Sequence, residues 1–403
     1  MNPLGAIGAS SSVIFLILGF CNGCTGGFGI PIAQCFGAKD YSNMRLHVSN
    51  ARRLSLTMSI LIAAITCFMC ARIMKWMLTP DEIFHDAWIY LFVTFAGIPF
   101  TMTYNLEASI LRAVGDSKTP FYFLLLASVL NVILDLCFIL VLNWGVEGAA
   151  LATVTSQGIS ALLCYNHTRR RFAILKAQNA SEKRIDTKAC LNLLNMGVPM
   201  GLQFSITAIG SIMLQTSNNA LGTACVTAFT AGMRLKMFFM CPLENIGVAM
   251  ATYCGQNLGA KKISRLWKGV KDSMLMCGIY YIIVLIGIQI FAKDLSKLFI
   301  YASETDILNK SALFLHVSTP FYIILGLLCV LRYSLQGVGY TKLSIMSGVF
   351  EMVARIAVSL TLVPALGFFG VCIGDPTAWV AANIFLIPAF FFVYKSLKRK
   401  YEN

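Results

Sequence analysis

Charged residues are scarce in this chain. Of its 403 residues only 12% are Asp, Glu, Lys or Arg, whereas 57% are hydrophobic and the mean hydropathy is +0.73. A soluble globular chain carries about 25% charged residues. The composition therefore excludes a soluble domain and indicates an integral membrane protein.

Several motifs that carry chemistry are also missing. No segment of the form G-x-x-x-x-G-K-[S/T] occurs, which excludes a P-loop ATPase within the chain. The four histidines are scattered, and no nucleophile, base and orienting group cluster in the sequence. We therefore expect no enzyme activity and no catalytic residue.

The fourteen cysteines do not favour a metal site. Two pairs, Cys21/Cys24 and Cys67/Cys70, have the C-x-x-C spacing of zinc and redox sites. Both pairs fall within apolar runs without a nearby histidine, where cysteine acts as a small hydrophobic residue. We expect no metal ligands and no bound cofactor.

Long apolar runs dominate the chain. Each is near or above the roughly 20 residues that an α-helix needs to cross a bilayer. The eleven runs are residues 10–36, 54–78, 87–111, 121–142, 146–165, 191–221, 223–254, 273–292, 312–335, 343–365 and 368–394. They predict an all-α membrane protein with about eleven transmembrane helices.

The sequence also repeats itself. Three segments recur in the same order at offsets of 222 or 224 residues: 34–39 as 256–261, 111–118 as 335–342, and 145–148 as 367–370. An internal repeat of apolar helices is typical of membrane proteins built from two lobes with a pathway between them. We therefore expect two homologous helical bundles.

The repeat predicts the domain organisation. We expect an amino-terminal lobe at 1–166, a basic cytoplasmic linker at 167–190, a carboxy-terminal lobe at 191–395 and a basic cytoplasmic tail at 396–403. The apolar stretch 191–221 opens the second copy, and its partner at the same offset falls before Met1. The first lobe is thus expected to have five helices, without its opening helix, and the second lobe six.

The net charge of +14 reflects topology rather than nucleic-acid binding. Basic residues gather after the first span, in the central linker, after the seventh span and at the carboxyl end, whereas the intervening loops carry acidic residues such as Asp86 and Glu147. This alternation is what the positive-inside rule requires. We expect a multi-pass protein of the cytoplasmic (inner) membrane with a cytoplasmic carboxyl terminus, and no nucleic-acid partner.

Ionisable groups within apolar spans are the best candidates for function, because charge at membrane depth costs about 2.5–3.5 kcal/mol on insertion scales. Asn131 and Asp135 are four residues apart and share one face of the fourth span. An aspartate there can be neutral when dry and ionised when wet, as ion coupling requires. The alternative is a structural hydrogen bond between the two side chains.

Other charges in spans favour structural or cavity roles. Glu351 and Arg355 are also four apart, which suits an ion pair within one helix. Glu107 and Arg112 lie near the cytoplasmic end of the third span, where either side chain can reach the membrane interface.

The seventh span carries Arg234, Lys236 and Glu244. Arg234 and Lys236 are two residues apart, so they point in divergent directions on a helix. In the last span, Asp375-Pro376 is expected to break the helix.

These motifs together resemble a known family, the multidrug and toxic compound extrusion (MATE) transporters, in the branch of DNA-damage-inducible-protein-F-like exporters. The resemblance rests on residues 32–39, 110–120, 131–135, 145–150, Pro199 and 255–260. It implies twelve helices in two six-helix lobes, and antiport of organic cations against H⁺ or Na⁺.

The resemblance also implies a role for two residues. Asn131 and Asp135 match a family helix whose Asn and Asp belong to the ion-coupling network of the amino-terminal lobe. That network includes an Asp from the first family helix, which is expected to be absent here, so the coupling site is expected to be incomplete.

We expect a monomeric secondary active exporter of amphipathic, cationic small molecules, with H⁺ or Na⁺ as the coupling ion. The alternative is a flippase for lipid-linked sugar precursors within the wider superfamily. Cations in the cavity would then bind an anionic pyrophosphate, and the candidates are Arg234, Lys236, Arg332 and Arg355.

Overall fold

The computed structural model describes residues 3–76 and 81–401, and the regular elements within these ranges are helices. In the first half they are α1 (Pro3–Gly37), α2 (Tyr41–Trp76), α3 (Asp81–Ala96), α4 (Ile98–Ala113), α5 (Lys118–Asp135), the π-helix η1 (Leu136–Val141), α6 (Gly145–Arg171), the 3₁₀-helix η2 (Ala173–Leu175) and α7 (Ala180–Lys183). In the second half they are α8 (Thr187–Asn219), α9 (Thr223–Gly259), α10 (Ser264–Ser296), α11 (Thr305–Ser318), the 3₁₀-helix η3 (Thr319–Phe321), α12 (Tyr322–Gly337), α13 (Thr341–Leu366), α14 (Phe368–Cys372) and α15 (Gly374–Tyr401).

The all-α prediction is confirmed, with a smaller count of clear spans. Among the described residues nine helices are long and apolar enough to cross a membrane, and α3 with α4, bent by 42° at Gly97, makes a tenth. The predicted span 146–165 lies within α6, which has 27 residues but is not among these nine. Its Gly, Ser, Thr and Gln residues make α6 less apolar than its neighbours.

Several helices extend beyond the predicted spans. Helix α2 begins at Tyr41 rather than at residue 54, so the basic residues before the predicted span are part of the helix. Helix α15 continues to Tyr401, through most of the predicted tail. Residues 77–78 of the second predicted span and 402–403 of the tail lie outside the described residues.

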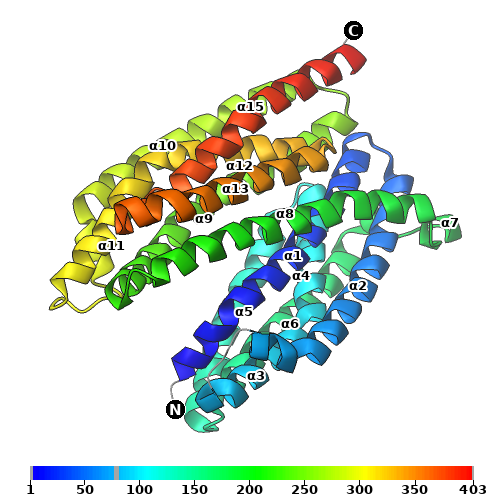
Figure 1. The fold of residues 1–403 in the computed structure, drawn as a ribbon. Coiled ribbons are helices and arrows are strands. Elements are labelled where there is room, and N and C mark those ends of the chain that lie inside the picture. The colour runs from blue at the N-terminus through cyan, green and yellow to red at the C-terminus, as the bar shows by residue number, and fades with distance from the viewer. Residues whose placement is uncertain (1–2, 77–80, 402–403) are drawn as a thin grey trace. The chain divides into compact units, whose positions relative to one another are not determined.

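Contacts divide the chain into two compact units, Met1–Ser205 and Ile206–Asn403. The division falls inside α8, so the first half of this helix packs with the amino-terminal unit. Figure 1 shows the chain coloured from the amino to the carboxyl end. Each unit is described below by itself.

In the amino-terminal unit, α4 is the central helix and packs against α1, α2 and α6, while α6 also contacts α3 and α5. Phe28 and Ile32 of α1, Met44 of α2 and Ile110 of α4 are fully buried in one shared core. This core fixes the helices that carry the polar side chains discussed below.

Helices α1 and α8 approach closely through glycines. A Cβ atom on Gly23 would lie 2.7 Å from Cα of Gly201, and one on Gly27 would lie 2.5 Å from Cα of Gly197. Both helices thus present a G-x-x-x-G pair, which lets their backbones come into contact. The glycine-dense run of α1 serves helix packing.

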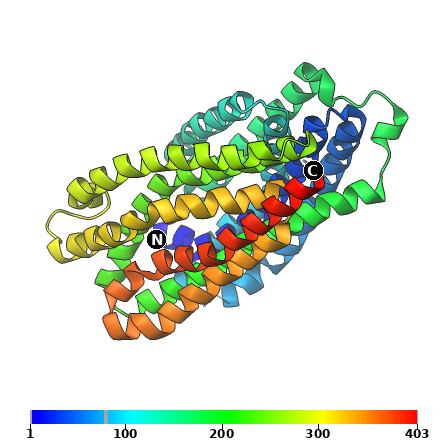
Figure 2. The same ribbon diagram turned by 90° about the horizontal axis from the view of Figure 1, so that it is seen from above.

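In the carboxy-terminal unit, α9 packs against α10, α11 and α12, and α13 packs against α15. Helix α12 also contacts α10 and α15, and these three run side by side in Figure 2. Arg332 to Gln336 of α12 are buried, so this helix lies in the interior of the unit.

The repeated segments adopt matching backbone conformations. Three pairs at the offsets found in the sequence share a positive φ: Lys39 and Lys261 at 59° and 58°, Gly115 and Gly339 at 93° and 92°, and Gly145 and Gly367 at 58° each. The first two pairs end helices in the left-handed conformation typical of helix C-termini. The internal repeat is therefore visible in the turns as well as in the sequence.

Candidate functional site

Asn131 and Asp135 lie on the same side of α5, toward α6. Asn131 Nδ2 donates a 3.4 Å hydrogen bond to Oγ1 of Thr153 on α6. Val132 and Ile133, between the two polar residues, are 58% and 56% exposed, so the apolar side of α5 faces outward. The spacing of four residues therefore turns both polar groups away from the lipid-facing side.

Asp135 ends α5, and the chain continues in the π-helical turn Leu136–Val141. Its Oδ1 atom is buried and has no hydrogen-bond partner among the described residues. No hydrogen bond joins Asp135 to Asn131 in this part of the chain, which argues against the structural alternative. π-turns occur often at functional sites, and an unpartnered buried carboxyl oxygen is rare in proteins.

Glu107 lies buried in the amino-terminal unit, in keeping with the structural role that the sequence favours for it. Its side chain is 1% exposed, and both its oxygens accept hydrogen bonds from Arg52 of α2, at 2.6 and 2.8 Å. The bidentate pair compensates the burial of both charges. Arg112 is half-buried near the end of α4 and forms no ion pair within the described ranges.

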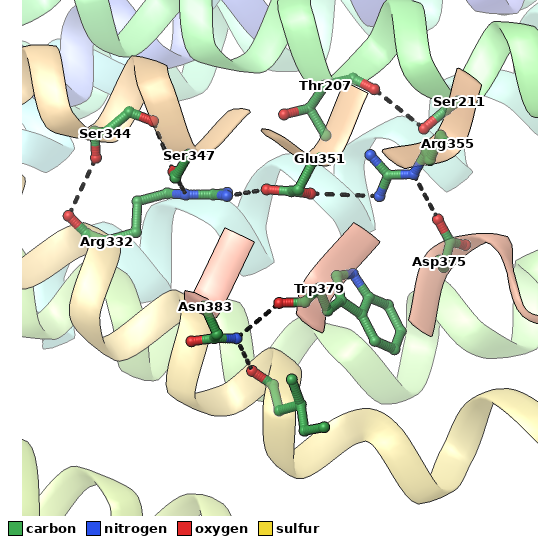
Figure 3. A network of polar contacts seen from close by, with 11 residues as sticks. Thr207, Ser211, Arg332, Ser344, Ser347, Glu351, Arg355, Asp375, Trp379 and Asn383 are labelled. Carbon is green, nitrogen blue, oxygen red and sulfur yellow. Dashed lines mark hydrogen bonds and ion pairs between the residues drawn. The ribbon is translucent and has the colours of Figure 1, made fainter. Parts of the chain in front are cut away.

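The carboxy-terminal unit contains a chain of buried charges, and Figure 3 shows the part that runs from Asp375 to Arg332. Asp375, in the first turn of α15, accepts from Lys236 of α9 with Oδ2 and from Nε of Arg355 with Oδ1, the latter at 2.8 Å. The side chains of these three residues are only 5–6% exposed. Helix breakage near Asp375 is confirmed, since α14 ends at Cys372 and α15 begins at Gly374.

The chain of charges continues through Glu351. Its Oε2 is 3.4 Å from Nη2 of Arg355, which confirms the predicted pair within α13. Its Oε1 accepts from Nη2 of Arg332 on α12, whose Nε also donates to Ser347 at 2.9 Å. Five charged groups from four helices thus alternate in sign.

This network of buried charges contains three cations and two carboxylates. Buried ion pairs contribute little net stability, but removing one partner leaves an uncompensated charge and costs about 3–5 kcal/mol. Arg355 Nη1 and Ser359 Oγ, one turn apart on α13, are buried without partners among the described residues. The arrangement therefore fixes helices α9, α12, α13 and α15 to one another and leaves one positive charge in surplus.

Arg234 and Lys236 diverge as predicted. Lys236 is buried against Asp375, whereas Arg234 is exposed and lines a cavity of about 270 Å³ with Thr230 and Phe299. Glu244, two turns after Lys236, is exposed and has no ion pair in the described part of the chain.

Two members of these buried ion pairs, Asp375 and Arg52, are not predicted as such from the sequence. Asp375 was interpreted only as part of a helix break, although an aspartate within an apolar span already signals a buried pair or a pathway. Arg52 belongs to the basic residues that follow the first span, and its partner Glu107 is 55 residues away in the sequence. Only the tertiary packing brings these charges together.

Comparison with known proteins decides the family. The MatE family profile matches residues 1–137 and 199–361, most of the chain. The chain belongs to the MatE family. The profile match confirms the resemblance found in the sequence. MATE transporters are multi-pass membrane proteins.

Two relatives of this MATE protein are named as probable multidrug resistance proteins. "Probable multidrug resistance protein YpnP" of Bacillus subtilis is 30% identical over 83% of this chain and 74% of its own length. "Probable multidrug resistance protein YoeA" of the same organism is 24% identical over 98% of this chain and 87% of its own. The fold matches the structure titled "Outward-facing conformation of a multidrug resistance MATE family transporter of the MOP superfamily" with a TM-score of 0.92, at 23% identity over 98% of this chain and 88% of the other.

Proposed function

We propose that this MATE protein is a secondary active exporter of amphipathic, cationic small molecules in the cytoplasmic membrane. Export is coupled to inward movement of H⁺ or Na⁺, and the two lobes alternate access to a central pathway. The protein acts as a monomer with its carboxyl terminus in the cytoplasm. Family membership and the multidrug relatives support this proposal.

Asp135 is the coupling residue in this proposal, and the observation that carries it is its unpartnered buried oxygen. Asp375 and Glu351 are locked between cations, whereas Asp135 forms no ion pair in the described part of the chain. Binding of H⁺ or Na⁺ at Asp135 would change the local charge without breaking a salt bridge. A ligand that binds one conformation more tightly shifts the balance between inward-open and outward-open states.

The flippase alternative gains no support from the site. Three of its four candidate cations, Lys236, Arg332 and Arg355, contact Asp375 or Glu351. Their charge is therefore largely compensated and is not free to bind a pyrophosphate.

The proposal is tested by ethidium efflux from a pump-deficient host. The chain is expressed together with whatever coding sequence precedes residue 1, as native protein, Asp135→Asn and Asp294→Asn. Asp294 is a matched control because its carboxylate is 64% exposed and pairs only with nearby Lys297. Membrane expression of each variant is measured by immunoblot.

Native protein and Asp294→Asn should export ethidium, and an uncoupler or removal of Na⁺ should stop export according to the coupling ion. Asp135→Asn should lose at least about tenfold in gradient-driven efflux, the change expected when an essential titrating group is removed. Unchanged efflux by Asp135→Asn would refute its coupling role. Absence of export by the well-expressed native chain would refute the exporter function for these dyes.

A further inference from the structure

A polar cavity lies in the amino-terminal unit, away from Asp135. It has a volume of about 370 Å³ and is walled by the amino-terminal part of α2, the end of α6 and the connection that includes η2 and α7. Ligand pockets in proteins commonly start at about 300 Å³. The cavity is therefore large enough for a small charged ligand or a lipid headgroup.

Cationic side chains dominate the lining of this cavity. Six of them contribute to it: Arg45, Arg52, Arg53, Arg169, Lys176 and Lys183. No Asp or Glu is among its lining residues, as far as the chain is described. Such a concentration of one sign of charge in a concave site focuses the electrostatic field and attracts anions.

Two of the six cations are held in place by carboxylates. Arg45 donates from Nε and Nη2 to Glu182, at 2.8 Å each. Arg52 binds Glu107 in the same bidentate manner and lies 5.1 Å from the ring centroid of Tyr165. These contacts fix the positions of the two guanidinium groups.

The other four cations are uncompensated. Arg53, Arg169, Lys176 and Lys183 are exposed and form no ion pair in the described part of the chain. Four like charges around one small cavity repel one another, and a polyvalent anion between them would remove that repulsion. Arginine and lysine together are the usual side chains that bind phosphate.

We propose that this cavity binds a phosphate-bearing anion. Arg53, Arg169, Lys176 and Lys183 supply the charge, and the fixed guanidinium groups of Arg45 and Arg52 form the floor. The site lies where two long helices end, so the phosphate can come from an anionic lipid headgroup or from a soluble phosphate ester. The four uncompensated cations are called the cationic rim below.

Binding is tested on the purified 403-residue chain by thermal shift. In the first arm, the protein in phosphatidylcholine nanodiscs is titrated with inorganic pyrophosphate. In the second arm, nanodiscs of phosphatidylcholine are compared with nanodiscs that also contain phosphatidylglycerol. The rim variant replaces all four rim cations by Gln, and a control variant makes the same change at Lys262, Arg265, Lys395 and Arg399, which lie outside the cavity.

Pyrophosphate should stabilise the native chain and the control variant, and its dissociation constant should rise by about tenfold or more in the rim variant. Stabilisation by phosphatidylglycerol alone, lost in the rim variant, assigns the site to lipid. If the rim and control substitutions weakened ligand binding equally, the binding would depend only on the overall positive charge, and the proposal would be overturned. Failure of both ligands to stabilise the native chain would also overturn it.

A labelling experiment on the native chain covers the case in which the rim variant does not fold. Pyridoxal 5′-phosphate forms an imine with a lysine amine, with loss of water, and borohydride reduces the imine to a stable secondary amine. Mass spectrometry should find Lys176 or Lys183 labelled in preference to Lys262 and Lys395, and pyrophosphate should protect them. Uniform labelling without protection would contradict the site.

Discussion

Arg52 and Glu107 form a two-point contact between α2 and α4, in which Nε and Nη2 donate to the two carboxylate oxygens at 2.6 and 2.8 Å. Glu107 is 1% exposed and Arg52 is 24% exposed, so water can reach the cation but not the carboxylate. The pair joins helices that also share the core around Met44 and Ile110. It is therefore a structural contact of the amino-terminal unit.

Glu107→Gln should destabilise the protein by about 1–3 kcal/mol, because a charged bidentate contact is lost and Arg52 regains only part of its hydration. Unfolding in detergent, followed by circular dichroism, measures the change. Asp294→Asn, on the exposed end of α10, should stay within about 0.5 kcal/mol of the native chain. Equal stability of the two variants would mean that the buried pair contributes nothing.

The buried charges of the carboxy-terminal unit make a sharper prediction. Asp375→Asn leaves both Lys236 and Arg355 without their shared carboxylate and should cost about 3–5 kcal/mol. Lys236→Met removes the surplus cation and leaves the remaining pairs intact, so it should cost clearly less. Comparison of the two unfolding midpoints checks the order, and a greater loss for Lys236→Met would contradict the arrangement.

The Glu351–Arg355 pair and the Asp375 contacts show which parts of the site a sequence can predict. Glu351 and Arg355 are four residues apart on one helix, so helical geometry alone predicts their pairing. Lys236 and Asp375 are 139 residues apart, and their contact depends on how α9 and α15 pack. The fold class and the repeat were predictable for the same reason as the local pair, because both follow from spacing along the chain.

The boundaries of the helices also depend on contacts between distant segments, which spacing along the chain does not reveal. The second apolar run begins only at residue 54, so the sequence places Arg45 and Arg52 before that span. In the structure α2 begins at Tyr41, and the two arginines pair with Glu182 and Glu107 from distant segments. A sequence does not reveal such compensation until the packing is known.

The repeated turns predict a local stability effect. Gly115 has φ 93°, a conformation that costs a residue with a Cβ atom about 1–2 kcal/mol. Gly115→Ala should lower the free energy of unfolding by about that amount, although its Cβ would meet no atom within 4 Å. Gly278→Ala in α10 is the control, since it also meets no atom but has helical backbone, and it should be neutral or stabilising. Similar effects at both positions would contradict backbone strain as the cause.

The connection between the two halves of the chain should loosen at low pH through Glu182. Hydrogen bonds from the side chain of Arg45, and further ones from the Gln178 N–H and the Ser42 hydroxyl, lower the pKa of Glu182 from 4.5 to about 2. A carboxylate whose pKa is depressed in the folded state contributes stability above its ordinary pKa, and this contribution is lost as pH falls toward the folded value.

The docking of α7 on α2 should therefore weaken between about pH 4.5 and about pH 2. Hydrogen exchange measured by mass spectrometry, corrected for the pH dependence of intrinsic rates, should rise in residues 173–186 relative to α10 across this window. At neutral pH, Glu182→Gln should reproduce the loosening and speed tryptic cleavage after Lys183 and Arg184, whereas Asp294→Asn should not. A linker equally protected in Glu182→Gln and in the native chain would show that the Arg45–Glu182 contact does not hold it in place.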